Sequence, residues 1–178
     1  MTNNHIEILY SEEELNSKIA KIAKEISAKY RHETIYMFCI LNGAAHFFSS
    51  LTSKITDVDI IEKYIRTSSY GANTVSSGKV EVEITLDIGT DIKDKPIIIV
   101  EDIIDSGHTM GTLVKIFRRM SPKSIEVCTM LDKPSRREVN DFPIDYCGFR
   151  VDDVFIVGYG LDYDQRYRNL PYIGYILQ

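Results

Sequence analysis

The stretch PIIIVEDIIDSGHT, residues 96–109, carries the most information about the fold. Its first five residues, 96–100, form an apolar and largely β-branched run, which is typical of a buried strand. Two carboxylates, Glu101 and Asp102, follow that run, and Asp105 stands three residues further on. In open α/β sheets ligands bind beyond the carboxyl ends of the strands. The stretch therefore predicts a ligand site at one end of a parallel sheet.

The turn after Asp105 has the composition of an anion-binding loop. Ser106, Gly107 and Thr109 are small or hydroxylic, and glycine adopts positive φ without cost. Backbone N–H groups in such a turn can surround an anion at the positive end of the following helix. One phosphate monoester would fit there. An ordinary structural interpretation stays open, in which Asp105 and Ser106 cap the helix and the preceding acids are solvated.

The segments on either side alternate between strand and helix patterns. The predicted helices cover about residues 11–30, 44–54 and 109–120, and the predicted strands cover 34–41, 58–66, 79–86, 96–100, 124–131 and 153–160. Ser11 followed by Glu14 is a capping-box pattern at the start of the first helix. This order predicts an α/β fold, with a central, largely parallel sheet flanked by helices, as a single domain over residues 1–178.

Residues 67–78, TSSYGANTVSSG, are small and polar and offer almost nothing to bury. They join two predicted strands, so the segment indicates a two-stranded ribbon with a mobile tip. Loops of about twelve residues without regular structure are uncommon in compact domains and often cover active sites. A loop without a role is the alternative.

Composition excludes some classes of protein and of location. The 178 residues carry a formal charge of −5, which argues against a nucleic-acid-binding protein. Apolar runs are too short for a membrane span, and the first residues lack the pattern of a secretory signal. Cys39 and Cys128 lie in strand-like runs, so we expect buried free thiols and a reducing compartment, the cytoplasm.

The segment VEDIIDSGHT also resembles the phosphoribosyl-pyrophosphate motif of type I phosphoribosyltransferases, particularly their hypoxanthine-guanine branch. The resemblance extends over about residues 34–170 and implies that family's fold, with a small hood from the terminal segments. It implies that Glu101 and Asp102 hold the ribose hydroxyls and the magnesium shell. It also implies that Asp105 acts as general base, and that the 5′-phosphate is bound by Asp105, Ser106, Gly107, His108 and Thr109, with His108 acting through its backbone.

A second match is the turn Leu41-Asn42-Gly43, which resembles the family's pyrophosphate-binding turn. Many relatives have a basic residue at its middle position, where this chain has Asn42. A backbone amide can still bind pyrophosphate oxygens there. Relatives often hold a cis peptide in this turn, at the position of Leu41-Asn42. Without the resemblance, the turn would read as an ordinary strand-to-helix connection.

Further matches lie in the soft loop and near the purine end. Ser69-Tyr70 resembles the Ser-Tyr pair of the family's catalytic loop, which closes over the reacting carbon. The resemblance implies that Lys133 reads the exocyclic oxygen of the purine, that Phe155 stacks on the base, and that the Ile156 carbonyl accepts from it. It also implies that Asp162 joins Glu101 and Asp102 as a metal-associated carboxylate, and that Arg168 binds pyrophosphate.

The implied activity is purine salvage, in which phosphoribosyl pyrophosphate and a 6-oxopurine give a nucleotide and pyrophosphate. Hypoxanthine is the first expected base and guanine the second, with Mg²⁺ as cofactor and a homodimer or homotetramer as the assembly. Lys133 donates hydrogen bonds but cannot accept them, which disfavours adenine. Two alternatives remain: a xanthine-preferring enzyme, and a regulator on the same fold that binds RNA or nucleotide through Arg118-Arg119 or Arg136-Arg137.

Overall fold

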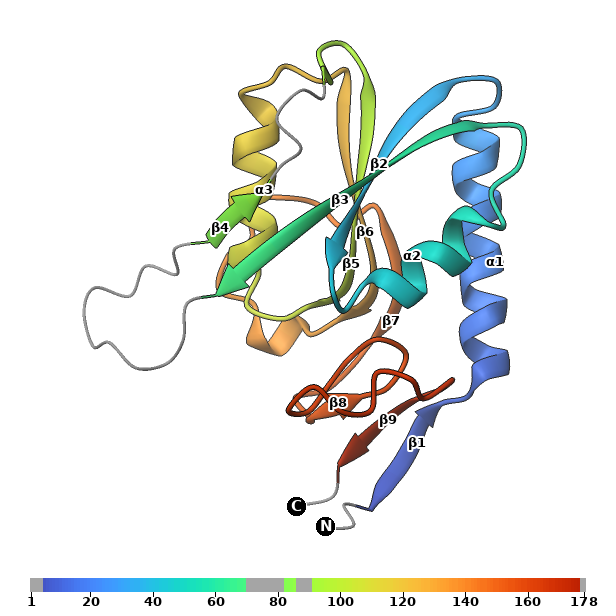
Figure 1. Cartoon of the computed structure of the whole chain (residues 1–178), viewed down its shortest axis with the longest axis vertical. Coiled ribbons are helices and arrows are strands. Elements are labelled where there is room, and N and C mark those ends of the chain that lie inside the picture. Colours follow the sequence, from blue (N-terminus) through green and yellow to red (C-terminus); the bar gives the residue numbers. More distant parts are fainter. Residues whose placement is uncertain (1–4, 70–81, 86–90, 177–178) are drawn as a thin grey trace, which may run out of the picture.

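The computed structural model has a six-stranded sheet at its centre, in the order β4-β3-β2-β5-β6-β7 (Figure 1). It describes residues 5–69, 82–85 and 91–176, with only the backbone given at 67–69 and 82–85. The strands are β2 (Thr34–Leu41), β3 (Asp59–Ser69), β4 (Val82–Thr85), β5 (Pro96–Ile104), β6 (Ser124–Asp132) and β7 (Tyr146–Arg150). Neighbours from β3 to β7 are parallel, and β4 pairs antiparallel with β3. The predicted largely parallel sheet is confirmed.

Helices cover both faces of this sheet, as the sequence predicted. They are α1 (Glu12–Lys29), α2 (Ala45–Thr52) and α3 (His108–Arg118), and a short 3₁₀ turn, η1 (Pro134–Arg136), follows β6. Alternate residues of β5 face opposite sides, because side chains alternate along a strand. Ile98 and Val100 pack in the core that contains the buried faces of α1 and α2, and Ile97 and Ile99 pack in the core under α3. None of the helices in the described ranges is long and apolar enough to cross a membrane.

The first helix begins where its capping box predicted. Ser11 is the N-cap of α1, its side chain accepts from the backbone N–H of Glu14, and the Glu14 carboxylate accepts from the backbone N–H of Ser11. Its apolar stripe, which includes Leu15, Ile19 and Ile26, is fully buried. The helix therefore covers one face of the sheet with the side chains that its periodicity indicated.

A second, three-stranded sheet lies beyond the carboxyl ends of the main strands (Figure 1). Its strands are β1 (Ile6–Tyr10), β9 (Ile173–Ile176) and β8 (Ile156–Val157), all antiparallel. This is the hood that the family resemblance implied. The sequence reading of 153–160 as a strand of the main sheet was wrong, because only Ile156–Val157 is extended there. Positive φ at Gly158, Tyr159 and Gly160 breaks the run.

Three further strands, β5, β7 and β3, differ from the predictions. Strand β5 continues to Ile104, so Glu101 and Asp102 lie within the strand and project to opposite faces rather than following its end. The fifth parallel strand is β7, whose five residues YCGFR were too short and mixed to be recognised. The predicted ribbon exists as the β3–β4 pair, but β3 extends to Ser69. Residues 70–78 of the predicted loop lie outside the described residues.

Candidate active site at the strand ends

The turn between β5 and α3 forms a small cavity. Gly107, the N-cap of α3, has φ 86°, which glycine tolerates and other residues rarely adopt. Within the described part of the chain, the N–H groups of Ser106, Gly107, His108 and Thr109 have no hydrogen-bond acceptor. The turn borders a cavity of about 90 Å³ that is also lined by Glu101, Ile103, Ile104, Asp105 and Met110. Unpaired amides beside a hollow at a helix N-terminus favour an anion.

The two adjacent carboxylates of β5 are both perturbed. Burial raises the pKa of Glu101 well above its ordinary value, the neighbouring charge of Asp102 raises it further, and Arg137 opposes both effects. Burial also raises the pKa of Asp102 to about 6, with Asp162 adding to the rise and Arg168 opposing it. Both carboxylates are therefore costly to keep charged without a partner, and cations or hydroxyl donors from a ligand would relieve that cost.

The predicted pyrophosphate turn lies against Asp102. The Leu41-Asn42 peptide bond is cis. A Cβ atom on Gly43 would lie 1.8 Å from Asp102 Oδ2, so only glycine lets the turn approach the carboxylate this closely. A Cβ atom on Gly160 would in turn lie 2.1 Å from the Gly43 carbonyl oxygen. Two loops and strand β5 thus converge at this point, through close approaches of backbone to side chain and of backbone to backbone.

An ion pair completes this convergence. Arg168 Nη2 lies 2.6 Å from Asp162 Oδ1, and Arg168 Nη1 donates to the Gly160 carbonyl oxygen at 2.6 Å. Asp162 also accepts from the backbone N–H of Gln165 at 2.8 Å. Both charged side chains influence the pKa of Asp102, so the structure gathers Asp102, Asp162 and Arg168 around the same turn. Two of the three sit far along the chain from β5.

A larger cavity, of about 450 Å³, lies between the main sheet and the hood. It is lined by Ile103, Asp105, Lys133, Arg136, Asp153, Val154, Phe155, Ile156 and Leu161. Lys133 is buried, with 7% of its surface exposed, and its Nζ donates to the Val154 carbonyl oxygen at 2.7 Å. Phe155 is 47% exposed and meets Tyr163 edge-on, with 5.4 Å between ring centroids. An exposed aromatic ring and a buried ammonium suit a flat heterocycle with an oxygen substituent.

Asp105 stands where the two cavities meet. It lines both the 90 Å³ and the 450 Å³ cavity, as does Ile103. Its Oδ1 accepts from Arg136 Nε at 3.1 Å, and Arg136 Nη1 reaches Asp153 Oδ2 at 3.5 Å. A single carboxylate therefore faces the space for an anion on one side and the space for a heterocycle on the other.

The sequence-based predictions missed four charged residues that support the site. They are Asp132 at the end of β6, Arg136 and Arg137 shortly after it, and Asp153 after β7. Arg136 and Asp153 line a cavity, Arg137 contacts its wall, and Asp132 pairs with Arg137. The reading considered Arg136-Arg137 only as part of a basic face, yet both guanidinium groups pair with carboxylates in the structure. Their position directly after a predicted buried strand was the available signal, since strand exits in α/β sheets carry ligand-binding residues.

The remaining predicted residues, His108, Ser69 and Tyr70, differ in how fully the structure describes them. His108 lies at the start of α3, and its Nε2 is 2.8 Å from Glu138 Oε2, so the ring is engaged with the protein surface. Ser69 is the last residue of β3, where only the backbone is described, and Tyr70 lies outside the described residues.

No cluster of three or more metal-ligating side chains occurs in the described ranges 5–69, 82–85 and 91–176. Mg²⁺ keeps several waters and commonly binds through one or two carboxylates together with substrate phosphates. Asp102 and Asp162 fit that mode, because both are oxygen donors and Asp162 lies close enough to raise the pKa of Asp102. The residues present therefore fit a cation that arrives with a phosphorylated substrate, rather than a metal held by protein ligands alone.

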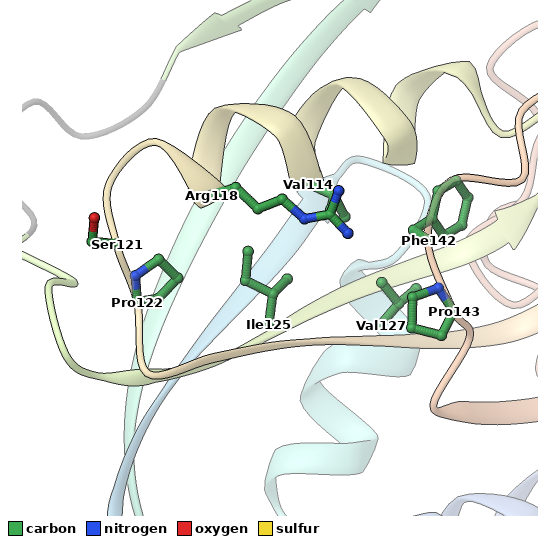
Figure 2. A pocket seen from close by; sticks show the side chains of 8 residues that line it. All are labelled: Val114, Arg118, Ser121, Pro122, Ile125, Val127, Phe142 and Pro143. Atoms are coloured by element: carbon green, nitrogen blue, oxygen red, sulfur yellow. The ribbon is translucent and has the colours of Figure 1, made fainter.

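A further cavity of about 320 Å³ lies away from the strand ends, between α3 and the early part of β6 (Figure 2). Val114 and Arg118 from α3 line it together with Ile125 and Val127 from β6 and the Phe142-Pro143 pair. Ser121 and Pro122 complete its lining, which contains one cation, Arg118, and no carboxylate. None of these residues lines the cavities at the strand ends.

Comparison with known proteins agrees with this geometry. The phosphoribosyl transferase domain family matches residues 5–164. The hypoxanthine-guanine phosphoribosyltransferase of Bacillus subtilis (strain 168) is 46% identical over 167 residues, which is 94% of this chain and 91% of that protein. The hypoxanthine phosphoribosyltransferase of Escherichia coli (strain K12) is 39% identical over 174 residues, 97% of this chain and 96% of that protein. A crystal structure of a hypoxanthine-guanine phosphoribosyltransferase from Bacillus anthracis, with HEPES in the active site, superposes with a TM-score of 0.87 at 41% identity and covers 97% of this chain and 100% of that one. The chain belongs to the phosphoribosyltransferase family, in its hypoxanthine-guanine branch.

Proposed function

We propose that the site transfers the phosphoribosyl group of phosphoribosyl pyrophosphate to hypoxanthine, and also to guanine, and releases pyrophosphate. One observation carries this proposal: Asp105 borders both the cavity with unpaired amides and the cavity with Lys133 and Phe155. The reaction needs a sugar phosphate and a purine to meet at one carbon atom. A carboxylate at the junction of two such cavities is in the place where a proton must be removed.

The 5′-phosphate occupies the small cavity in this proposal. The N–H groups of the turn from Ser106 to Thr109 donate to its oxygens, and the N-terminus of α3 adds a favourable field. His108 contributes its backbone, since its ring is turned to Glu138. Glu101, which is buried and lines the same cavity, and the half-buried Asp102 receive the ribose hydroxyls, so that both carboxylates gain hydrogen-bond donors.

The pyrophosphate lies at the turn that is formed by Leu41, Asn42 and Gly43. The backbone amides of the turn and the Arg168 guanidinium neutralise its charge as it departs. Asp102 and Asp162 would hold the shell of a Mg²⁺ that arrives with the substrate, and the ion would supply further charge neutralisation at the leaving group.

The purine occupies the larger cavity. Phe155 offers an exposed ring face for stacking, and the Ile156 carbonyl accepts from the base. Lys133 donates to the 6-oxo group, for which its ammonium exchanges part of its contact with the Val154 carbonyl. Adenine would place an amino group against this ammonium, leaving two donors facing each other.

The chemical step is a displacement at C1′. The C1′–N9 bond forms while the bond from C1′ to the pyrophosphate oxygen breaks, and pyrophosphate leaves with the electron pair. Asp105 takes the proton from N7 of the purine, which raises the electron density at N9 as it attacks. The carbon resembles an oxocarbenium ion at that stage, so water has to be kept away. We assign this task to the loop that contains Ser69 and Tyr70, and it stays a prediction.

Location and assembly are also part of the proposal. Cys39, Cys128 and Cys147 are free thiols, which supports a reducing compartment such as the cytoplasm. A homodimer or homotetramer is the assembly implied by the family resemblance, and light scattering on the purified protein would determine it.

The test is a direct assay of nucleotide formation. Purified protein with Mg²⁺ and phosphoribosyl pyrophosphate is offered hypoxanthine, guanine, xanthine and adenine separately, and nucleotide is followed by absorbance. We expect the highest kcat/KM with hypoxanthine, activity with guanine and none with adenine. Preference for xanthine would instead support the xanthine-preferring alternative. No nucleotide from any 6-oxopurine would contradict catalysis and favour the regulator on the same fold.

A further inference from the structure

Arg137 is a buried arginine that the proposed reaction does not use. Its side chain is 9% exposed, and its guanidinium lies 5.7 Å from the centre of the Phe142 ring. It pairs with the buried carboxylate of Asp132. Burying an arginine is costly unless its donors are satisfied, so the contacts that it makes indicate what it holds in place.

Those contacts are with the backbone of the phosphate turn. Arg137 Nε donates to the Asp105 carbonyl oxygen at 3.1 Å, and Arg137 Nη2 donates to the Ile104 carbonyl oxygen at 3.3 Å. The next carbonyl, that of Ser106, accepts from the backbone N–H groups of Glu138 and Val139 at 2.9 and 3.0 Å. Residues 137–139 thus contact three consecutive carbonyl groups, and they share the first of these, that of Ile104, with the backbone N–H of Lys133 at 3.0 Å.

The geometry of the peptide bond turns this into an effect on the amides. In a trans peptide the C=O of one residue and the N–H of the next point in opposite directions. Holding the carbonyls of Ile104, Asp105 and Ser106 therefore directs the N–H groups of Asp105, Ser106 and Gly107 away from residues 137–139. Those three residues line the 90 Å³ cavity. Gly107 permits the arrangement because a Cβ there would lie 2.9 Å from Arg137 Cδ and 2.7 Å from the Val139 carbonyl oxygen.

We propose that Arg137 is a positioning residue for phosphate binding: by fixing two carbonyl groups from behind, it keeps the amides of the turn aimed at the 5′-phosphate. The role rests on the proposed function, because it requires that the small cavity takes the phosphate. Arg137 itself lies behind the turn and does not line that cavity. The positive charge of Arg137 also lowers the pKa of Glu101, against the rise that burial causes. The same side chain thus favours the charged form of a carboxylate that lines the cavity.

The test separates the phosphate end of the substrate from the pyrophosphate end. Ribose 5-phosphate uses the turn at Ser106 and Gly107, whereas pyrophosphate with Mg²⁺ uses the turn at Asn42-Gly43 and Arg168. Titration calorimetry with each ligand on Arg137→Gln is expected to give a dissociation constant for ribose 5-phosphate that is raised about tenfold or more, with that for pyrophosphate changed less than about twofold. In steady-state assays, KM for phosphoribosyl pyrophosphate rises more than KM for hypoxanthine.

The matched control is Arg150→Gln. Arg150 also faces Asp132, at 3.7 Å, but it is 80% exposed and makes no contact with the turn. We expect both dissociation constants of this variant to stay at the wild-type values. Equal weakening of both ligands in Arg137→Gln would overturn the proposal, because it would mean general loss of structure. Unchanged binding of ribose 5-phosphate would overturn it too.

Arg137→Gln leaves the buried Asp132 with only the exposed Arg150, at 3.7 Å, and could prevent folding. Arg137→Lys then carries the test, because it keeps the charge but its single ammonium cannot reproduce the fork that spans both carbonyls and Asp132. Selective weakening of ribose 5-phosphate is again expected, and wild-type affinity would overturn the proposal. A wild-type chain that binds no ribose 5-phosphate would overturn the phosphate site itself, and the role of Arg137 with it.

Discussion

Arg136 Nε donates to Asp105 Oδ1 over 3.1 Å, and the same guanidinium reaches Asp153. The side chains of Arg136 and Asp105 are 51% and 44% exposed, so water screens the pair. Exposed ion pairs of this kind contribute little to stability. The contact therefore orients the carboxylate of Asp105 but binds it only weakly. An arriving purine can replace Arg136 as its partner.

We expect Arg136→Met to change the free energy of unfolding by less than about 1 kcal/mol, since both of its ion pairs are exposed. Urea denaturation followed by circular dichroism would measure this. A loss well above that size would mean that Arg136 holds more of the structure than its two exposed contacts suggest.

Replacing Asp105 by asparagine removes the proton acceptor but keeps the shape of the side chain. Asp105→Asn is expected to lower kcat by about 10²–10⁴, the range for loss of a general base. Steady-state kinetics with hypoxanthine measures the effect, and Asp59→Asn, at an exposed strand end, serves as the control. A decrease of only a few-fold would remove Asp105 from the role of base.

Lys133→Ala is expected to weaken the purine selectively. The variant loses a charged donor to the 6-oxo group, and such hydrogen bonds contribute about 1.5–3 kcal/mol, so KM for hypoxanthine should rise about tenfold or more. KM for phosphoribosyl pyrophosphate should change much less. Lys93→Ala, at an exposed lysine, controls for loss of a positive charge. Equal changes in the two KM values would argue that Lys133 supports the fold of the site and does not read the base.

The pyrophosphate turn allows a contrast between adjacent positions. Gly43→Ala places a methyl group in the space of the Asp102 carboxylate and should destabilise the protein by about 1–3 kcal/mol, as overpacking does, with loss of activity. Asn42→Ala should leave KM for phosphoribosyl pyrophosphate within a few-fold if the backbone amide makes the contact. Thermal unfolding and steady-state kinetics on both variants test this, and a large rise in that KM for Asn42→Ala would assign the contact to the side chain.

Substitution of Asp102 should change the free energy of unfolding by an amount that depends on pH. Burial raises its pKa to about 6, from about 4 in an unfolded chain, so the folded state binds the proton more tightly. Folding disfavours the charged form of Asp102. The free energy of unfolding therefore falls as pH rises from about 4 to 6, because the folded state has to accommodate the charge. Without ligands, Asp102→Asn should therefore raise the free energy of unfolding at pH 7 by about 1–3 kcal/mol.

Below pH about 4 the Asp102 carboxyl is neutral in both states, and the gain from Asp102→Asn should vanish. Urea titrations at pH 7 and pH 4 measure both conditions. A destabilised variant at pH 7 would contradict the inferred cost of burying this charge. The same substitution should weaken phosphoribosyl pyrophosphate, so stability and binding would change in opposite directions.

Local patterns predicted much of the main sheet and its helices. The strand at 34–41 has the predicted bounds, because an apolar run that ends at Asn-Gly leaves little freedom in where it stops. The capping box of α1 is a contact between neighbours in sequence, and it too was readable. The hood was harder, since β1 and β9 lie at opposite ends of the chain and each is stable only through the other.

The same distinction applies to the site. Residues 101–109 could be recognised from the sequence, because acids and small residues follow a buried apolar run there. Lys133, Asp162 and Arg168 look like ordinary surface charges when read singly, and only the family resemblance indicated them. Arg137 stands shortly after a predicted buried strand, but no pattern indicated its role, because its partners include backbone carbonyls about thirty residues away, and a sequence pattern does not show where a carbonyl group points.

The pairing of β8 with β9 has a consequence for synthesis of the protein. The Phe155 carbonyl oxygen accepts from the Ile176 N–H at 3.1 Å, and Ile156 pairs with Tyr175. During synthesis on a ribosome, some twenty residues are added between Phe155 and its partner strand β9. At ordinary elongation rates this takes about one to four seconds. A nascent chain can assemble the phosphate turn during that interval, but it gains a complete nucleobase pocket only once residues 173–176 have emerged.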